Sequence, residues 1–303
     1  MLSINHLGAK RGRRVLLSLF LLLSGNSPAL CDTCARVVSL APSISEVMVS
    51  LGLAENLVGV SRYDMPFEAN EHVESVGGYI DPNYEQVLSL EPTIVFLLKE
   101  HQAAFEKLTK LGVRVARLEH RDIDGILDSV ILIGTECGVG EKARTLREKL
   151  VAQSNGVTKE VDNYRKNNLP PQKVLILLGD EPGALRSLYV SGNDGFFSDL
   201  LSRVHAVNLY QDQTTSLQGL SQEGFLQLDP DCIIQIADPK APRFSRADFL
   251  RKWQSFKELR AVRSEKIYYF QDLAFHIPGP RFIYAQKLLA EVLYPSLKIN
   301  LGV

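Results

Sequence analysis

The chain has 303 residues, of which 45% are hydrophobic and 23% are charged, and it contains four cysteines. These values are typical of a folded globular protein, and they exclude a collagen, a disulfide-dense miniprotein and a disordered chain. With 34 basic and 35 acidic side chains, the chain also lacks the basic excess that phosphate binding requires. We therefore expect no nucleic acid among its partners.

The first 30 residues have the pattern of a secretory signal peptide. Four bases between Lys10 and Arg14 precede an apolar run over residues 15–23, and a small, polar stretch follows that ends at Ala29. The apolar run is less than half of the roughly 20 residues that a membrane-spanning helix needs. We therefore expect residues 1–30 to be a signal peptide and the remaining chain to be exported and soluble.

The four cysteines form no recognisable zinc or redox motif. Cys31 stands where a lipid-modified cysteine can follow a signal peptide, but such signals require a small residue before the cysteine and here it is Leu30, so we expect no lipid anchor. Cys31 and Cys34 are predicted to have no role or to form a local disulfide. Cys137 and Cys232 lie in apolar segments and are predicted to be buried as small hydrophobic side chains.

From residue 36 onward, short apolar strands alternate with helices. The first four predicted strands are Val37–Leu40, Leu57–Val60, Thr93–Leu98 and Val113–Ala116. Ser43 and Glu46 form a capping-box pattern, which predicts a helix start after the first strand. The third strand is apolar throughout, as is typical of a parallel strand that is buried on both faces. The alternation predicts an α/β fold with a parallel sheet.

A proline-free stretch from Gly140 to about residue 167 interrupts this alternation. Its apolar residues recur at spacings of three, four and seven, which predicts one apolar stripe on a helix roughly 40 Å long. Pro170 and Pro171 end the helix, and a second α/β unit begins with the strand at 174–178. The predicted domains are the N-terminal lobe (36–139), the linker helix (140–168) and the C-terminal lobe (172–303).

An internal repeat relates the two lobes. Residues 84–96 align without a gap on residues 222–234, so that Glu85 corresponds to Glu223. Each copy is predicted to be a short helix, an acidic-Pro turn and a buried strand. The match indicates two similar α/β lobes, although such an element can also recur by chance or without a common architecture.

The motifs of the common enzyme classes are missing. The chain has no G-x-S-x-G elbow, Walker A loop, G-x-G-x-x-G fingerprint or H-E-x-x-H zinc motif. Its six histidines show no spacing that is typical of metal ligands. We therefore expect no catalytic residue, no metal site and no cofactor. The alternative from another class is a two-lobed metal-handling enzyme such as a chelatase, which would need converging His, Cys or carboxylate ligands.

Aromatic and charged residues follow the predicted strands, at the edge where parallel α/β sheets bind ligands. Aromatic faces with a few polar groups suit a large ligand that is partly apolar and partly charged. Arg281 opens the last helix, where its guanidinium and the helix N-terminus can together hold an anion. The candidate ligand-binding residues are Tyr63, Tyr79, Lys99, Tyr189, Asp272, Phe275, His276 and Arg281.

Four segments resemble the substrate-binding proteins of ABC importers for metal chelates. They are Arg36–Glu46, Val58–Ser61, Val76–Gly78 and the motif Tyr84-Glu85-x-x-Leu88-x-x-x-Pro92. The resemblance covers about residues 36–297, and the family serves iron-siderophores, haem and cobalamin. It implies two Rossmann-like lobes joined by a single rigid helix, with the ligand in the cleft between the lobes and only a small closing motion.

The resemblance also implies a function. It predicts a periplasmic protein that captures a metal chelate and delivers it to an ABC permease and its ATPase, and we expect this protein to be a monomer. In the cobalamin- and siderophore-binding members, one glutamate on each lobe docks onto arginines of the permease. The matching positions here are Glu85 and Glu223.

The resemblance leaves the ligand open. Tyr63, Tyr79 and Tyr189 match aromatic positions of the cobalamin pocket and Asp272 a polar one, while two further aromatic positions correspond to Leu98 and Leu217. Lys99 and Arg281 suit an anionic chelate, and His276 or a tyrosine is a candidate axial ligand of haem iron. A receptor for free zinc or manganese ions shares the layout, but it would need histidines and carboxylates where tyrosines dominate here.

Overall fold

The described part of the chain consists of several segments. The computed structural model describes residues 33–64, 73–165, 170–184, 188–192, 195–211, 217–219 and 222–301. From Thr33 onward the chain forms one compact unit. The predicted signal peptide and Cys31 lie outside the described residues. None of the described helices has the length and apolar composition that crossing a membrane requires.

The N-terminal lobe is built on a five-stranded sheet in the order β3-β2-β1-β4-β5, and all neighbouring strands are parallel. Its strands are β1 (Val37–Ser39), β2 (Leu57–Val60), β3 (Glu74–Ser75), β4 (Ile94–Leu98) and β5 (Val115–Leu118). Its helices are α1 (Pro42–Ser50), the 3-10 turn η1 (Ala54–Asn56), α2 (Tyr84–Ser89), α3 (Gln102–Lys110) and α4 (Ile123–Glu136). The central strands β1 and β4 are buried over their whole length, which explains their apolar sequences.

The C-terminal lobe has a six-stranded sheet in the order β11-β10-β6-β7-β9, with β8 paired to β6. Its strands are β6 (Gln172–Leu178), β7 (Tyr189–Ser191), β8 (Ala206–Asn208), β9 (Leu217–Gly219), β10 (Cys232–Ile236) and β11 (Ile267–Phe270). Its helices are α6 (Phe196–Arg203), α7 (Gln222–Leu228), α8 (Arg246–Lys252), the 3-10 turn η4 (Gln254–Phe256), α9 (Arg260–Arg263), α10 (Leu273–His276) and α11 (Phe282–Leu293).

This second sheet is parallel except at one edge. β7 pairs antiparallel with both β6 and β9, while β6, β8, β10 and β11 pair in parallel. The connection from β6 to β7 spans residues 179–188, which is shorter than the dozen or more residues that a parallel crossover needs. A short return therefore produces an antiparallel pair. The prediction of a parallel sheet is therefore wrong at this edge of the C-terminal lobe.

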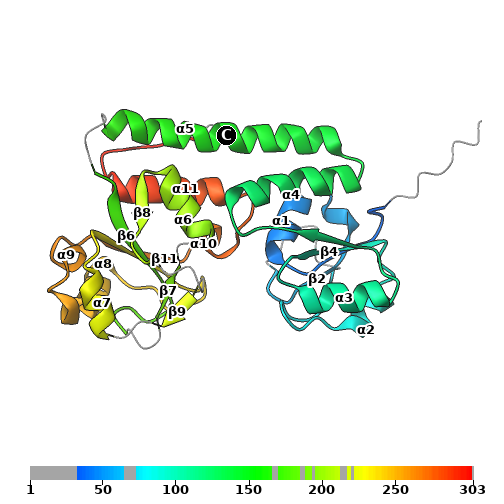
Figure 1. The fold of residues 1–303 in the computed structure, drawn as a ribbon, viewed down its shortest axis with the longest axis horizontal. Helices are drawn as coiled ribbons and strands as arrows, with labels where there is room; N and C mark the ends of the chain where they lie inside the picture. Colours follow the sequence, from blue (N-terminus) through cyan, green and yellow to red (C-terminus); the bar gives the residue numbers. More distant parts are fainter. Residues whose placement is uncertain are drawn as a thin grey trace, which may run out of the picture. The chain divides into compact units, whose positions relative to one another are not determined.

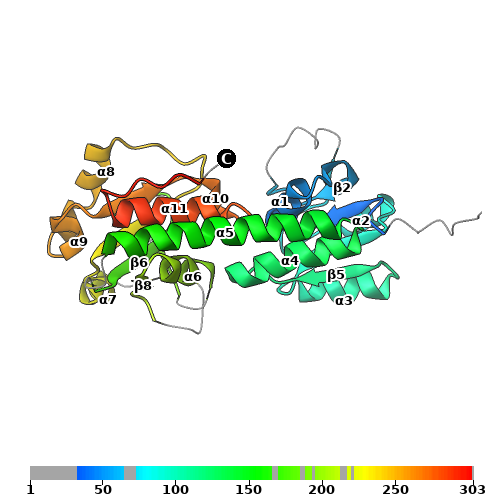
Figure 2. The same ribbon diagram turned by 90° about the horizontal axis from the view of Figure 1, so that it is seen from above.

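Helix α5 (Gly140–Arg165) connects the lobes and packs against α4 and α11 (Figures 1 and 2). Its 26 residues span about 39 Å at 1.5 Å per residue. Its buried residues lie three to seven positions apart; they are Ala143, Leu150, Ser154, Val157 and Val161. The four apolar ones belong to the predicted stripe, whereas Tyr164, at the end of that stripe, is 38% exposed. The structure confirms the predicted fold class, two α/β lobes whose mainly parallel sheets are linked by one long helix.

Helix α4 also belongs to both lobes. Ile123, Ile126 and Leu127, near its start, pack in the core of the C-terminal lobe together with residues of α6 and α11. Val130 and Ile133, further along the same helix, pack in the core of the N-terminal lobe. The covalent link through α5 is thus supplemented by a helix that is shared between two hydrophobic cores.

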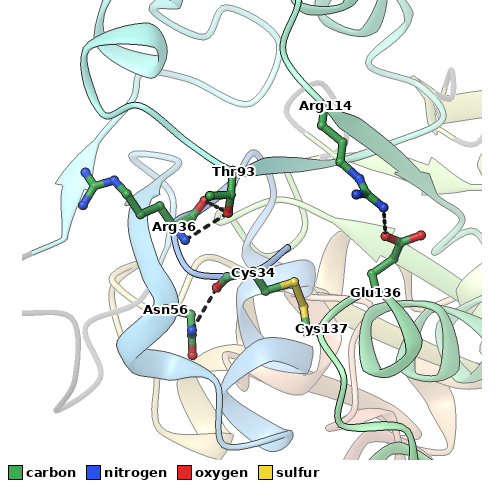
Figure 3. The surroundings of a disulfide bond; sticks show 7 residues. All are labelled: Cys34, Arg36, Asn56, Thr93, Arg114, Glu136 and Cys137. Atoms are coloured by element: carbon green, nitrogen blue, oxygen red, sulfur yellow. Dashed lines mark hydrogen bonds and ion pairs between the residues drawn. A yellow bond between two sulfur atoms is a disulfide. The ribbon is translucent and has the colours of Figure 1, made fainter. Parts of the chain in front are cut away.

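A disulfide bond joins Cys34 to Cys137, 103 residues apart (Figure 3). It connects the segment that precedes β1 with the residue that follows α4. The Asn56 side chain donates a hydrogen bond to the Cys34 carbonyl at 2.8 Å. The predicted local bridge between Cys31 and Cys34 is therefore wrong, as is the prediction that Cys137 is an unbonded apolar side chain. Cys232 is free and buried, which confirms its prediction.

Candidate functional site

A cavity of about 820 Å³ lies between the two lobes. Its walls come from the carboxyl ends of β4, β5 and β6, from the first turns of α1 and α6, and from the end of α10. This is the edge at which parallel α/β sheets bind ligands. The volume falls within the range of roughly 300–1,000 Å³ that is usual for small-molecule sites.

The N-terminal lobe contributes a wall of paired charges and aromatic rings. Lys99 forms an ion pair with Glu119 at 3.0 Å, and the Tyr79 hydroxyl donates to Glu100 at 2.6 Å. The Tyr79 and His101 rings form a T-shaped contact at 4.4 Å between centroids. Burial and the hydrogen bond to Glu100 both raise the pKa of Tyr79 above its usual value, so this tyrosine stays a neutral phenol.

Tyr63 presents an open ring to the same cavity. Its side chain is 60% exposed, and the Arg62 guanidinium lies 5.7 Å from the ring centroid. Arg62 is itself held by Asp81 at 2.9 Å. One cation, Arg121, also lines the cavity, and no ion pair engages it in the part of the chain that the structure describes.

A buried histidine forms part of the cavity floor. His120 is 5% exposed, and its Nδ1 lies 2.7 Å from the Ser43 hydroxyl. Its Nε2 has no hydrogen-bond partner among the described residues. Burial lowers the pKa of His120 to about 4, so the ring is neutral at pH 7.

The C-terminal lobe supplies a second imidazole and two phenylalanines. Nε2 of His276 donates to the Ala237 carbonyl at 2.7 Å, so that in the neutral imidazole Nδ1 is the acceptor. Phe196 and Phe197 open α6 and contact each other edge to face at 5.4 Å. Aromatic surface from both lobes therefore faces the cavity.

The predicted ligand-binding residues divide into two groups. Tyr63, Tyr79, Lys99 and His276 line the cavity, whereas Tyr189, Asp272, Phe275 and Arg281 are not part of its lining.

Each residue of the second group has another environment. Tyr189 is 52% exposed on β7, and the Asp272 carboxylate caps α10 by accepting from the Ala274 amide at 2.8 Å. The Phe275 ring is 2% exposed and stacks on Phe270 in the core at 4.8 Å.

Arg281 connects the lobes at this point. Its guanidinium donates to the Glu46 carboxylate on α1, which is mostly buried. Burial raises the pKa of Glu46, and Arg281 partly opposes this shift. The predicted capping box of Ser43 and Glu46 therefore does not form. Helix α1 begins directly after Ala41 and has no side-chain cap. The Ser43 side chain bonds to His120 instead, and the Glu46 side chain to Arg281.

The sequence prediction missed several residues of the lining. They are Pro42, Ser43, Glu100, Glu119, His120, Arg121, Phe196 and Phe197. Glu119, His120 and Arg121 directly follow β5, so the same carboxyl-end rule that selected Lys99 would have found them. Phe196 and Phe197 follow a short strand on the irregular edge of the second sheet, which no local pattern predicts.

The two predicted docking glutamates lie away from the cavity. Glu85 and Glu223 are exposed in the first turns of α2 and α7. Among the described residues, no group of three His, Cys, Asp or Glu side chains is arranged to hold a metal ion.

The chain is similar to known proteins over most of its length. Residues 37–273 match the periplasmic binding protein family. An uncharacterised ABC transporter substrate-binding lipoprotein of Bacillus subtilis (strain 168) is 27% identical over 266 residues, which cover 86% of this chain and 80% of that protein.

Two further relatives are named for the ligand that they bind. A vitamin B12-binding protein of Pectobacterium atrosepticum is 27% identical over 202 residues, which cover 66% of this chain and 70% of the relative. The crystal structure of a periplasmic heme binding protein from Pseudomonas aeruginosa superimposes with a TM-score of 0.72 at 25% identity, covering 87% of this chain and 94% of that one.

Proposed function

Since this chain belongs to the periplasmic binding protein family, we propose that it captures a metal chelate and delivers it to the permease of an ABC importer. The observation that carries the proposal is the cavity of about 820 Å³, with aromatic rings from both lobes in its walls. Relatives that bind vitamin B12 and haem support a ligand with a large, flat, metal-bearing ring. Members of the family bind solutes and are not enzymes.

The chemistry of the walls suits recognition without covalent steps. Tyr63, Phe196 and Phe197 offer apolar ring surface, and aromatic contacts contribute about 0.5–1.5 kcal/mol each beyond the area that they bury. Lys99 is neutralised by Glu119, so Arg121 is the cation that remains for an anionic edge of the chelate. An anionic group such as a carboxylate or a propionate fits there.

The two imidazoles and Tyr79 differ as ligands of a metal centre. A phenolate is needed for coordination, and the hydrogen bond to Glu100 keeps Tyr79 protonated. In the neutral form of His276, the Nε2 hydrogen bond to a backbone carbonyl leaves the Nδ1 lone pair free to coordinate a metal. If the chelate is haem, His276 is therefore the better axial ligand.

We infer that the protein is exported to the periplasm through residues 1–30. The Cys34–Cys137 disulfide supports this inference, because disulfides persist in oxidising compartments and are rare in reducing ones. Delivery to the permease then uses Glu85 and Glu223, with the ATPase on the far side of the membrane.

Chelate titration tests the proposal. The chain from Thr33 onward is mixed with cobalamin, haem or a ferric siderophore, and binding is followed through the absorption of the chelate. The single tryptophan, Trp253, is fully buried in the C-terminal core and is not part of the cavity lining, so its emission is a poor reporter. We expect micromolar or tighter binding of one chelate; if none binds below the millimolar range, the proposal is wrong.

A matched pair of variants connects the binding to the cavity. Tyr63→Ala removes an exposed cavity ring, and Tyr284→Ala removes a ring of similar exposure on α11 that does not line the cavity. Loss of one aromatic contact corresponds to roughly a three- to tenfold rise in the dissociation constant for Tyr63→Ala. Tyr284→Ala should leave it unchanged, and equal effects of the two substitutions would place the chelate elsewhere.

A further inference from the structure

The charge of the chain is concentrated in one segment of the C-terminal lobe. Residues 240–266 contain nine bases and three acids, whereas the other residues from position 31 onward contain 21 bases and 32 acids. The nine bases are Lys240, Arg243, Arg246, Arg251, Lys252, Lys257, Arg260, Arg263 and Lys266, and all are exposed. We refer to residues 240–266 as the basic face.

The members of the basic face are neighbours in space. Helices α8 and α9 lie at one end of the C-terminal lobe in both views (Figures 1 and 2). The Arg246 guanidinium reaches across to the backbone carbonyls of Glu265 and Ile267, on either side of Lys266. Arg260, Arg263 and Lys266 line one groove of about 720 Å³. Bases from α8, from α9 and from the turn before β11 thus lie near one another at this end of the lobe.

Local carboxylates cancel only part of this charge. Arg260 pairs with Asp229 at 2.8 Å and with Asp231 at 2.7 Å, and Arg251 pairs with Asp248 at 3.1 Å.

Five bases keep their full charge available. In the described chain, no ion pair or hydrogen bond engages the side chain of Lys240, Arg243, Lys252, Lys257 or Lys266. No large apolar side chain of the basic face is exposed. The surface is therefore suited to electrostatic contact and not to insertion into an apolar phase.

The basic face borders helix α7. Phe225 of α7 packs on Trp253 and Phe256 of the basic face, at 5.9 and 5.5 Å between ring centroids. Glu223 on the same helix is one of the two carboxylates assigned to permease docking. A C-terminal lobe that docks through Glu223 therefore brings the basic face next to the membrane that holds the permease.

We propose that the basic face binds the anionic phospholipid headgroups of that membrane. The orientation of the basic face toward the membrane rests on the proposed function, whereas the number of its bases and their position in the fold do not. Each base near an anionic surface strengthens partition roughly fivefold, and the attraction extends over about a Debye length. Several unpaired bases on flexible stems match a laterally fluid layer of phosphates, which presents charge without a fixed shape. Contact of this kind would keep the loaded protein close to its permease.

Vesicle flotation tests the proposal without a permease. The chain from Thr33 onward is mixed with vesicles of phosphatidylglycerol and phosphatidylcholine in equal parts, or of phosphatidylcholine alone. At about 0.1 M salt, where the Debye length is roughly 10 Å, we expect the protein to float with the anionic vesicles only. At about 1 M salt, where it falls to about 3 Å, we expect release.

Two triple variants with the same change in charge locate the contact. Replacing Arg243, Lys257 and Lys266 with glutamine should lower the partition at least tenfold. The control replaces Lys110, Lys149 and Lys159 with glutamine, which are exposed bases of α3 and α5, and it should float like the unmodified chain.

Three outcomes would overturn the proposal: binding to uncharged vesicles, equal loss in both triple variants, or no flotation with anionic vesicles at low salt. The last result would leave an acidic protein surface as the partner of the basic face. Chelate titration of the same variants keeps the two proposals separate. A chain that floats but binds no chelate contradicts only the proposed function, and a chain that binds a chelate but does not float contradicts only the membrane contact.

Discussion

The imidazole of His120 shows how burial alone keeps a side chain of the cavity wall uncharged at neutral pH. The ring is 5% exposed, shares a hydrogen bond with Ser43, and has no acid among its hydrogen-bond partners. Its folded-state pKa of about 4 lies below the 6.5 that it has when solvated. Between these values the unfolded chain binds a proton that the folded chain does not, so stability rises with pH across this window and is lost as the pH falls through it.

We therefore predict that His120→Asn removes a component of acid destabilisation. For a shift from 6.5 to about 4, this component is on the order of 3 kcal/mol between pH 6.5 and pH 4. The measurement is the free energy of unfolding by urea at several pH values in this interval. The unmodified chain should lose more stability than the variant as the pH falls, and parallel profiles would show that His120 is not the group responsible.

Helices α2 and α7 repeat each other at the level of single positions. Over Glu85–Leu90 and Glu223–Leu228, exposed and buried residues follow in the same order, with Val87 and Phe225 facing the core. Each helix is followed by an acidic residue with a positive φ before a proline, at 45° for Glu91 and 39° for Asp229. The internal repeat seen in the sequence thus describes a repeated structural element, which presents one carboxylate on each lobe.

Two matched carboxylates fix an orientation on a two-subunit partner better than one can. We predict that Glu85→Ala and Glu223→Ala each weaken delivery up to about fivefold, as is usual for exposed ion pairs, and that the double variant weakens it by more than tenfold. The readout is chelate uptake by cells that make the variant in place of the natural chain. The control variant, Glu148→Ala with Glu160→Ala on α5, should transport normally. A fall in chelate affinity of the double variant would contradict a docking role.

At the scale of the whole molecule, contacts between distant segments decide what local patterns cannot. Hydrophobic periodicity and the repeat were enough to predict α5, the two-lobed fold and seven of the described strands, but not the short strands β3, β7, β8 and β9. They could not predict that Cys137 bonds to Cys34, or that Arg281 pairs with Glu46, 235 residues away. These patterns also could not distinguish Phe275, whose ring lies in the core, from an aromatic residue that lines the cavity, because both kinds of residue follow a strand.

Several of these distant contacts connect the lobes. Helix α4 packs in both cores, and its first amide, at Ile123, donates to the Asp199 carboxylate of α6 at 2.9 Å. Arg203 of α6 pairs with Asp124 of α4 at 3.4 Å, and Arg281 with Glu46 forms a separate ion pair between the lobes. We infer that the lobes unfold as one cooperative unit.

The disulfide offers a test of this cooperativity, because it closes a loop within the N-terminal lobe while Trp253 reports on the C-terminal core. Replacing Cys34 and Cys137 with serine should lower the free energy of unfolding by about 2–5 kcal/mol, since the unfolded chain regains the freedom of a loop of roughly 100 residues. If the lobes are coupled, Trp253 emission and circular dichroism must shift to lower denaturant together. Cys232→Ala changes a free thiol in the other lobe and serves as the control for loss of a cysteine. A Trp253 transition that stays in place while the circular dichroism shifts would mean that the C-terminal lobe unfolds alone, and that the contacts through α4 are too weak to couple the two cores.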